Sequence, residues 1–220
     1  MFNNLLSLAP DFWKAIGETF AMVGISVGSA LLFGTPLGIL IFVTGHGQIF
    51  EHKVIHRVVN YVVNTVRSLP FVILLVALIP LTRLMIGTTI GPIAASVPLS
   101  IAAIPYFARL VEQSLREIPK GVIEAAVAMG ASPLEIIWKV MLNEARSSIV
   151  SALTVTSISL LSYSAMAGTV GGGGIGDLAI RFGYYRFQTE VMIATIILLI
   201  IWVQIIQFVG SRLAHVLDKR

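Results

Sequence analysis

Cysteine is absent from this 220-residue chain, and charged residues make up only 12% of it. The lack of cysteine excludes disulfides, thiolate catalysis and cysteine-based metal sites. An ordinary soluble domain is about 25% charged, so the composition argues against a cytosolic enzyme and against a disordered tail. Hydrophobic residues supply 56% of the chain and the mean hydropathy is +0.91, which indicates a membrane protein.

Other groups are scarce where particular chemistries would need them. The four histidines lie in charged or glycine-rich segments without a His-x3-His pair in an apolar helix, so we expect no metal site. The long apolar runs contain no Asp or Glu, whereas ion-coupled carriers often place such groups near the membrane midplane. A Gly-x4-Gly-Lys-Ser/Thr phosphate loop is missing, so any ATP would be bound by a different subunit. The net charge of +4 is spread over short clusters, which argues against a nucleic-acid partner.

Five runs with little or no charge are long enough to cross the hydrocarbon core as helices, which takes about 20 residues. We predict spans at about 18–44, 58–82, 92–112, 147–168 and 190–212. They define one domain over residues 16–208, with short terminal segments at 1–15 and 213–220. The expected fold class is therefore an all-α integral membrane protein with five transmembrane helices per subunit.

The distribution of Lys and Arg predicts the orientation, because cytoplasmic loops are enriched in both residues. With the N-terminus outside, the inner segments hold ten of the fifteen basic residues, the outer segments hold four, and Arg67 lies within the second span. We therefore expect an extracytoplasmic N-terminus and a cytoplasmic C-terminus. No internal repeat is visible, so any two-fold symmetry would come from dimerisation.

The polar segment 109–146, between the third and fourth spans, is long enough to hold structure of its own. Pro119 ends the preceding helix, a second helix follows up to Gly130, and Ser132-Pro133-Leu134-Glu135 is a capping box. Four apolar residues at helical spacing then predict an apolar face: Leu134, Ile137, Trp138 and Met141. Such a helix pair suits the docking of a partner, and an ordinary surface hairpin is the alternative.

The stretch Glu124-Ala125-Ala126-x3-Gly130, followed by Val140-x-Leu142, resembles the EAA motif of ABC importer permeases, the inner-membrane components of binding-protein-dependent transport systems. In that family the loop inserts a short coupling helix into a groove of a cytoplasmic ATPase subunit. The family pattern ends in Leu-Pro, whereas this chain has Leu142-Asn143. The resemblance assigns the ATPase-coupling role to Glu124, Ala125, Ala126, Met129, Gly130, Ala131, Ser132 and Pro133.

Further stretches resemble one branch of the family, the methionine-importer permeases, over nearly the whole chain. They are Arg67–Leu75, Ile79–Arg83, Gly87–Gly91 and Tyr163–Gly168. The resemblance implies the type I importer permease fold and a homodimer that moves methionine, in the L and D forms, across a bacterial inner membrane. It further implies a chain without enzymatic activity or cofactor of its own.

The same resemblance implies the partners. Two cytoplasmic ATPase subunits would bind ATP and Mg²⁺, and an extracytoplasmic methionine-binding protein or lipoprotein would deliver the substrate. The alternatives are a permease for another small amino acid or solute, and a self-sufficient secondary carrier.

Candidate residues of the translocation path come from the second and fourth spans. Arg67 is the one charge inside a span, where it would either act as a gate or snorkel to the interface. Hydroxyl residues of the fourth span would either line an aqueous path or let helices pack closely. The candidates are Arg67, Ser151, Thr154, Ser162, Tyr163, Ser164 and Met166. Because no span contains a histidine base, we do not expect Ser162 or Ser164 to be a protease nucleophile.

The glycine-rich run of residues 171–176 lacks the lysine and hydroxyl of a phosphate loop. We expect an outer loop near the external mouth, either mobile or closely packed. It would be a plain connector or would help to receive substrate from a binding protein.

Overall fold

The computed structural model describes residues 8–218, which are largely helical and contain no strand. The segments labelled η are π-helical. In chain order the elements are α2 (Ala9–Ser29), η1 (Ala30–Gly34), α3 (Thr35–Val43), α4 (Lys53–Ser68), α5 (Phe71–Ala77), α6 (Ile79–Ile86), α7 (Pro92–Arg116), α8 (Lys120–Ala128), α9 (Pro133–Glu135), η2 (Ile136–Met141), α10 (Leu142–Glu144), α11 (Arg146–Ala167), η3 (Gly168–Gly172), α12 (Gly174–Leu178), η4 (Ala179–Tyr184) and α13 (Thr189–Leu217).

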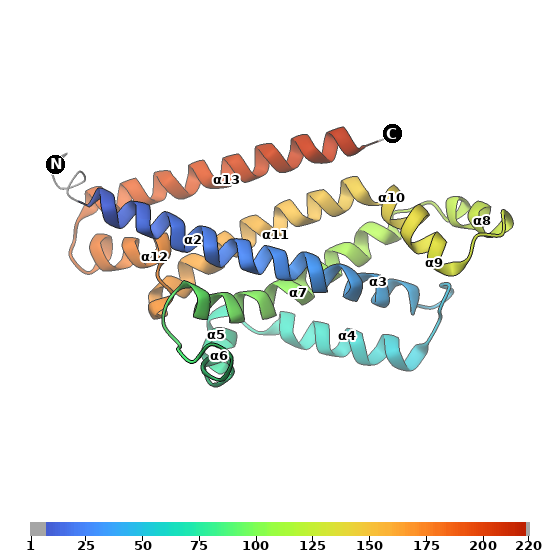
Figure 1. The fold of residues 1–220 in the computed structure, drawn as a ribbon, viewed down its shortest axis with the longest axis horizontal. Helices are drawn as coiled ribbons and strands as arrows, with labels where there is room; N and C mark the ends of the chain where they lie inside the picture. Colours follow the sequence, from blue (N-terminus) through green and yellow to red (C-terminus); the bar gives the residue numbers. More distant parts are fainter. Residues whose placement is uncertain (1–7, 219–220) are drawn as a thin grey trace.

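Within the described residues, four helical stretches are long and apolar enough to cross a membrane: Ala9–Val43, Pro92–Arg116, Arg146–Gly172 and Thr189–Leu217. They lie along the long axis of the molecule (Figure 1). α4 and α5 pass the same test as a pair but are bent by 103° at their break, so the number of spans rises to five if the pair crosses as one. The prediction of an all-helical, multi-pass membrane protein is confirmed.

The prediction that the second span is one continuous helix over residues 58–82 was wrong. α4 ends at Ser68, and Leu69 is extended, with φ −80° and ψ 131°. Pro70 explains the break, because a proline ring disfavours the helical conformation of the residue before it and removes a helical N–H donor. The chain then forms two short helices, α5 and α6, which lie across the bundle (Figure 1).

The core forms where α7 packs against the first helix and against α11. Leu99, Phe107 and Val111 of α7 have no exposed surface. Gly38 permits the close approach of α3, because a Cβ atom added there would lie only 2.8 Å from the Cβ atom of Val111. α7 is the most buried of the four long stretches, whereas α13 has the smallest share of buried residues, as expected of a lipid-facing helix.

The glycine-rich run of residues 171–176 is closely packed, which was one of the two expected alternatives. A side chain added at Gly176 would overlap the carbonyl of Ala165, and one added at Gly168 would overlap the amide of Asp177. The run therefore brings two backbones together without intervening side chains. As a result, α12 packs against both α2 and α11.

Candidate coupling segment and translocation path

The segment that carries the EAA-like motif lies at one end of the bundle, beyond the ends of α7 and α11 (Figure 1). α8 follows Pro119 and ends before Gly130, as predicted. The amide of Gly130 donates to the Val127 carbonyl at 2.9 Å, and the amide of Ala131 donates to the Ala126 carbonyl at 3.1 Å. These are the paired hydrogen bonds of a Schellman turn, and the φ of 79° at Gly130 is one that glycine tolerates best.

The capping box predicted at Ser132 is present. The Ser132 hydroxyl accepts from the Glu135 amide at 3.4 Å, and the Glu135 carboxylate accepts from the Ser132 amide at 3.1 Å. Lys139 also donates to this carboxylate, at 2.9 Å. The hydrogen bond from Lys139, followed by those from Ser132, lowers the pKa of Glu135 from 4.5 to about 2, because these donors stabilise the ionised carboxylate.

The apolar face predicted for the helix after Ser132 is divided in the structure. Ile137 and Met141 are buried, whereas Leu134 and Trp138 are 64% and 67% exposed. Residues 136–141 form a π-helix, whose wider turn carries residues out of the 3.6-residue pattern. The prediction of one shared face was therefore wrong.

Apolar side chains are nevertheless exposed on both sides of the turn. We define the exposed apolar cluster as Val127, Met129, Leu134 and Trp138, all of which are more than half exposed. Of the predicted coupling residues, Ala126 is buried, Ala131 is half-buried, and the others are exposed: Glu124, Ala125, Met129, Gly130, Ser132 and Pro133. An apolar surface beyond the ends of the long helices has the character of a docking site.

Two of the predicted path residues come together beside the break between α4 and α5. A cavity of about 160 Å³ is lined by Arg67 at the end of α4, by Tyr106 of α7 and by Tyr163 of α11, among others. The Tyr163 ring stacks on Phe71, with centroids 4.7 Å apart and planes 10° apart. Arg67 lies in the last turn of α4, where a positive charge interacts favourably with the helix dipole.

The other path candidates do not join this cavity. Thr154 is buried against α13, where a Cβ atom added at Gly210 would lie 2.7 Å from that of Thr154, so close helix packing accounts for this residue. Ser164 is buried and donates within α11, to the carbonyl of Leu161 at 2.7 Å. The remaining candidates are exposed: Ser151, Ser162 and Met166.

An ion-pair network that the sequence argument missed joins α7 to α4. The carboxylate of Glu112 is only 2% exposed and binds both Arg109 and Arg116. Arg109 also donates to the amide oxygens of Asn60 and Asn64 of α4, at 2.9 and 2.8 Å. The spacing of Arg109, Glu112 and Arg116 by three and four residues was the available signal, but no local pattern indicated the contact with α4.

The fold, its membrane-length helices and the glycine-closed turn at one end place this molecule in the class of multi-pass helical membrane proteins. Within that class, the chain belongs to the family described as "Binding-protein-dependent transport system inner membrane component", whose model matches residues 34–220. The family resemblance inferred from Glu124 to Gly130 is thereby confirmed.

Individual relatives are similar over almost their full length. The chain is 48% identical over 206 residues to "Probable D-methionine transport system permease protein MetI" of Vibrio cholerae, covering 94% of this chain and 92% of that protein. It is 41% identical to "Methionine import system permease protein MetP" of Bacillus subtilis, with 96% and 95% covered. Among solved structures, it matches a chain of "Inward facing conformations of the MetNI methionine ABC transporter" with a TM-score of 0.95 and 44% identity, covering 97% and 99%.

Proposed function

We propose that this chain is the permease subunit of an ATP-driven importer that carries methionine, in its L and D forms, across the bacterial inner membrane. The observation that carries the proposal is the glycine-closed turn at Gly130, followed by the capping box at Ser132 and flanked by the exposed apolar cluster. The names of the relatives support methionine as the substrate. The permease itself performs no covalent chemistry.

In this assembly, two copies of the chain form the path and each docks one cytoplasmic ATPase subunit, which binds ATP and Mg²⁺. An extracytoplasmic methionine-binding protein or lipoprotein delivers the substrate. The α4–α5 pair counts as one of five crossings, with the N-terminus outside and the C-terminus in the cytoplasm. Two features support this topology. α2 begins and α13 ends at opposite ends of the bundle, and α4, whose first turns carry the basic residues Lys53 and Arg57, begins at the end that carries α8 (Figure 1).

Access to the path alternates between the two sides of the membrane as the ATPase subunits close and open. ATP binding draws these subunits together, and the segment from Glu124 to Pro133 moves with them. α7 carries this motion inward, because it runs as one helix from Arg116, just before that segment, past Tyr106 to Pro92. We place Arg67 and Tyr163 in the path, since both line the cavity that Tyr106 also lines. Hydrolysis of ATP returns the permease to its starting state.

The test is reconstitution of the complete complex. The tagged chain is expressed with the products of its neighbouring genes, purified in mild detergent and placed in liposomes, and ATP-dependent uptake of labelled L- and D-methionine is measured. We expect a stable complex with an ATPase and saturable uptake. A complex that hydrolyses ATP but transports another amino acid would overturn the substrate. Solute movement by the permease alone, with no bound ATPase, would overturn the coupling role.

A further inference from the structure

The lysine, arginine and asparagine side chains of α4 form one narrow stripe along the helix. At about 100° per residue they fall within about 80° of one another, and at 1.5 Å per residue the stripe is about 21 Å long. Its members are Lys53, Arg57, Asn60, Asn64 and Arg67. Val54, Val58 and Val62 lie on a different side of α4 and are 65%, 55% and 55% exposed. Lipid or another apolar surface can cover the valines, but the stripe requires water or polar groups.

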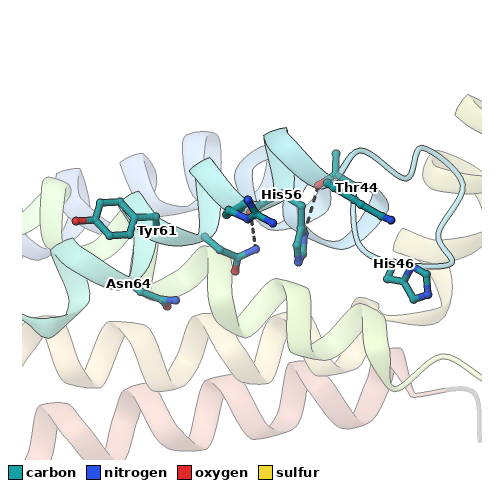
Figure 2. Close-up of a pocket in the computed structure, with 8 residues that line it drawn as sticks. Thr44, His46, His56, Tyr61 and Asn64 are labelled. Carbon is teal, nitrogen blue, oxygen red and sulfur yellow. Dashed lines mark hydrogen bonds between the residues drawn. The ribbon is translucent and has the colours of Figure 1, made fainter.

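Two cavities follow one another along the stripe. The first, of about 520 Å³, lies at the start of α4 and includes Lys53, Arg57 and Asn64 among its lining residues (Figure 2). The second is the cavity of about 160 Å³ at Arg67, one helical turn beyond Asn64. Tyr106 lines the second cavity, and Arg109 one turn later on α7 binds Asn60 and Asn64. One side of α7 therefore lies next to the stripe, with Tyr106 at the second cavity and Arg109 against two residues that line the first.

The first cavity presents positive charge and hydrogen-bond donors. None of its lining residues is a carboxylate, whereas Lys53 contributes an ammonium group and Arg57 a guanidinium group. Arg109 occupies the amide oxygens of Asn60 and Asn64, and Asn60 also donates one N–H to the His56 carbonyl at 2.8 Å. One N–H of Asn60 and the amide N–H groups of Asn64 therefore remain to donate to a ligand. A donor-rich, cationic surface of this kind selects an anion.

The neighbouring acidic groups are already engaged. Glu51, at the edge of the cavity, accepts from the Gly47 amide at 2.9 Å and binds His46 at 2.9 Å. Glu112 is buried behind Arg109 and pairs with it. His56 donates from Nδ1 to the Ile41 carbonyl at 3.0 Å, because that oxygen can only accept. Neither carboxylate lines the cavity itself, although Glu51 lies close enough to Lys53 for their charges to attract.

We infer that this stripe and Arg109 form a water-filled lane that binds the carboxylate of an amino-acid substrate as it passes between the Arg67 cavity and the end of the bundle that carries α8. The inference deepens the proposed function and rests on it for the identity of the substrate. Recognition by cations and amide N–H donors is directed at the carboxylate, which every amino acid shares, and leaves the choice of side chain to other residues.

The absence of cysteine provides a clean test. Single-cysteine variants are made at two stripe positions, Arg57→Cys and Asn64→Cys, and at two matched positions on the apolar side, Val58→Cys and Val62→Cys. In the reconstituted complex, each is treated with anionic and with cationic membrane-impermeant methanethiosulfonates. We expect both stripe positions to react, with Asn64→Cys reacting about tenfold faster with the anionic reagent, and the valine positions to stay unreactive. Equal labelling of both sides, or a preference for the cationic reagent, would overturn the inference.

A transport measurement tests the ligand. Arg57→Gln is expected to raise the KM for methionine uptake about tenfold and to weaken the preference for methionine over methionine amide, in which an uncharged amide replaces the carboxylate. Arg212→Gln on α13 is the control and should leave both the KM and the preference unchanged. An unchanged preference in Arg57→Gln would overturn carboxylate binding. If the wild-type complex transports no methionine but the stripe labels as expected, methionine is overturned as the substrate and the water-filled lane is supported. If methionine is transported and the stripe is unreactive, the lane fails alone.

Discussion

Gly176 of α12 lies directly against Ala165 of α11, so close that a methyl group added to the glycine would overlap the alanine carbonyl. This contact joins the two segments backbone to backbone, which a residue with a side chain does not permit. Gly168 makes the same kind of approach to the amide of Asp177. The connection between α11 and α12 is consequently stabilised by close backbone packing, which requires glycine at these positions.

Replacement of Gly176 by alanine is expected to destabilise the protein by about 1–3 kcal/mol, the usual cost of overpacking a tight contact. Gly28→Ala is the matched control, because a Cβ atom added at Gly28 in α2 would have no neighbour within 4 Å. The thermal unfolding midpoint of each purified variant in the same detergent gives the comparison. Similar midpoints for Gly176→Ala and Gly28→Ala would contradict the packing argument.

The sequence predicted the long apolar helices because length and hydropathy are local properties. It also predicted the turn at Gly130 and the capping box at Ser132, whose hydrogen bonds lie within a few residues. The break at Leu69 was missed even though Pro70 was visible, since a proline either kinks or ends a helix and the surrounding packing decides which.

The candidate path was only partly predictable, because it too depends on packing between segments that are far apart in the sequence. Arg67 and Tyr163 are far apart in sequence, and only the fold brings both to one cavity. Thr154 was a path candidate because hydroxyl residues suit an aqueous path as well as close helix packing. The contact with Gly210, which is far from Thr154 in the sequence, shows that Thr154 serves helix packing. The burial of Glu112 likewise depends on neighbours that no local pattern reveals.

Loss of Arg109 is expected to cost far more stability than loss of Arg116, although both bind Glu112. The Arg109 side chain is 26% exposed and the Arg116 side chain 60% exposed. Arg109→Gln leaves a buried carboxylate poorly paired, at a cost of about 3–5 kcal/mol, whereas Arg116→Gln should cost at most about 1 kcal/mol. Thermal unfolding of the two variants provides the comparison, and equal losses would count against it.

The double variant Arg109→Gln/Glu112→Gln supplies the control for this pair. Removing the buried carboxylate together with its partner leaves no unpaired charge, so we expect the double variant to be more stable than Arg109→Gln alone. If it is less stable by the sum of the two single losses, the two side chains act independently.

The charge on Glu135 is expected to survive to unusually low pH. Lys139 and Ser132 bind the ionised carboxylate and lower its pKa from 4.5 to about 2. Because the folded pKa lies below the unfolded value, the contribution to stability is complete above pH 4.5 and disappears as the pH falls towards 2. Carboxyl ¹³C NMR of the glutamate-labelled protein would follow the titration. Lys139→Gln should raise this pKa more than Ser132→Ala, and the opposite order would contradict the assigned causes.

Docking of the ATPase is expected to depend on the exposed apolar cluster. Met129 in this cluster is 81% exposed, and Phe187, in the connection before α13 at the other end of the bundle, is 85% exposed. Met129→Glu should reduce the amount of ATPase that purifies with the permease, because a carboxylate would be desolvated at the interface. Phe187→Glu introduces the same group and should leave the amount unchanged. Equal recovery with both variants would exclude Met129 from the docking site.

Coupling of ATP hydrolysis to transport is expected to require the left-handed conformation of Gly130. Gly130 has a φ of 79°, Gly121 in α8 is helical, and a Cβ atom added at either residue would have no neighbour within 4 Å. Gly130→Ala and Gly121→Ala therefore differ in backbone strain rather than in crowding, and the strain at Gly130 is about 1–2 kcal/mol. We expect Gly130→Ala, and more strongly Gly130→Trp, to insert into the membrane but to transport less methionine per ATP hydrolysed. Gly121→Ala should keep the wild-type ratio. A normal ratio in Gly130→Trp would show that the turn geometry is not needed for coupling.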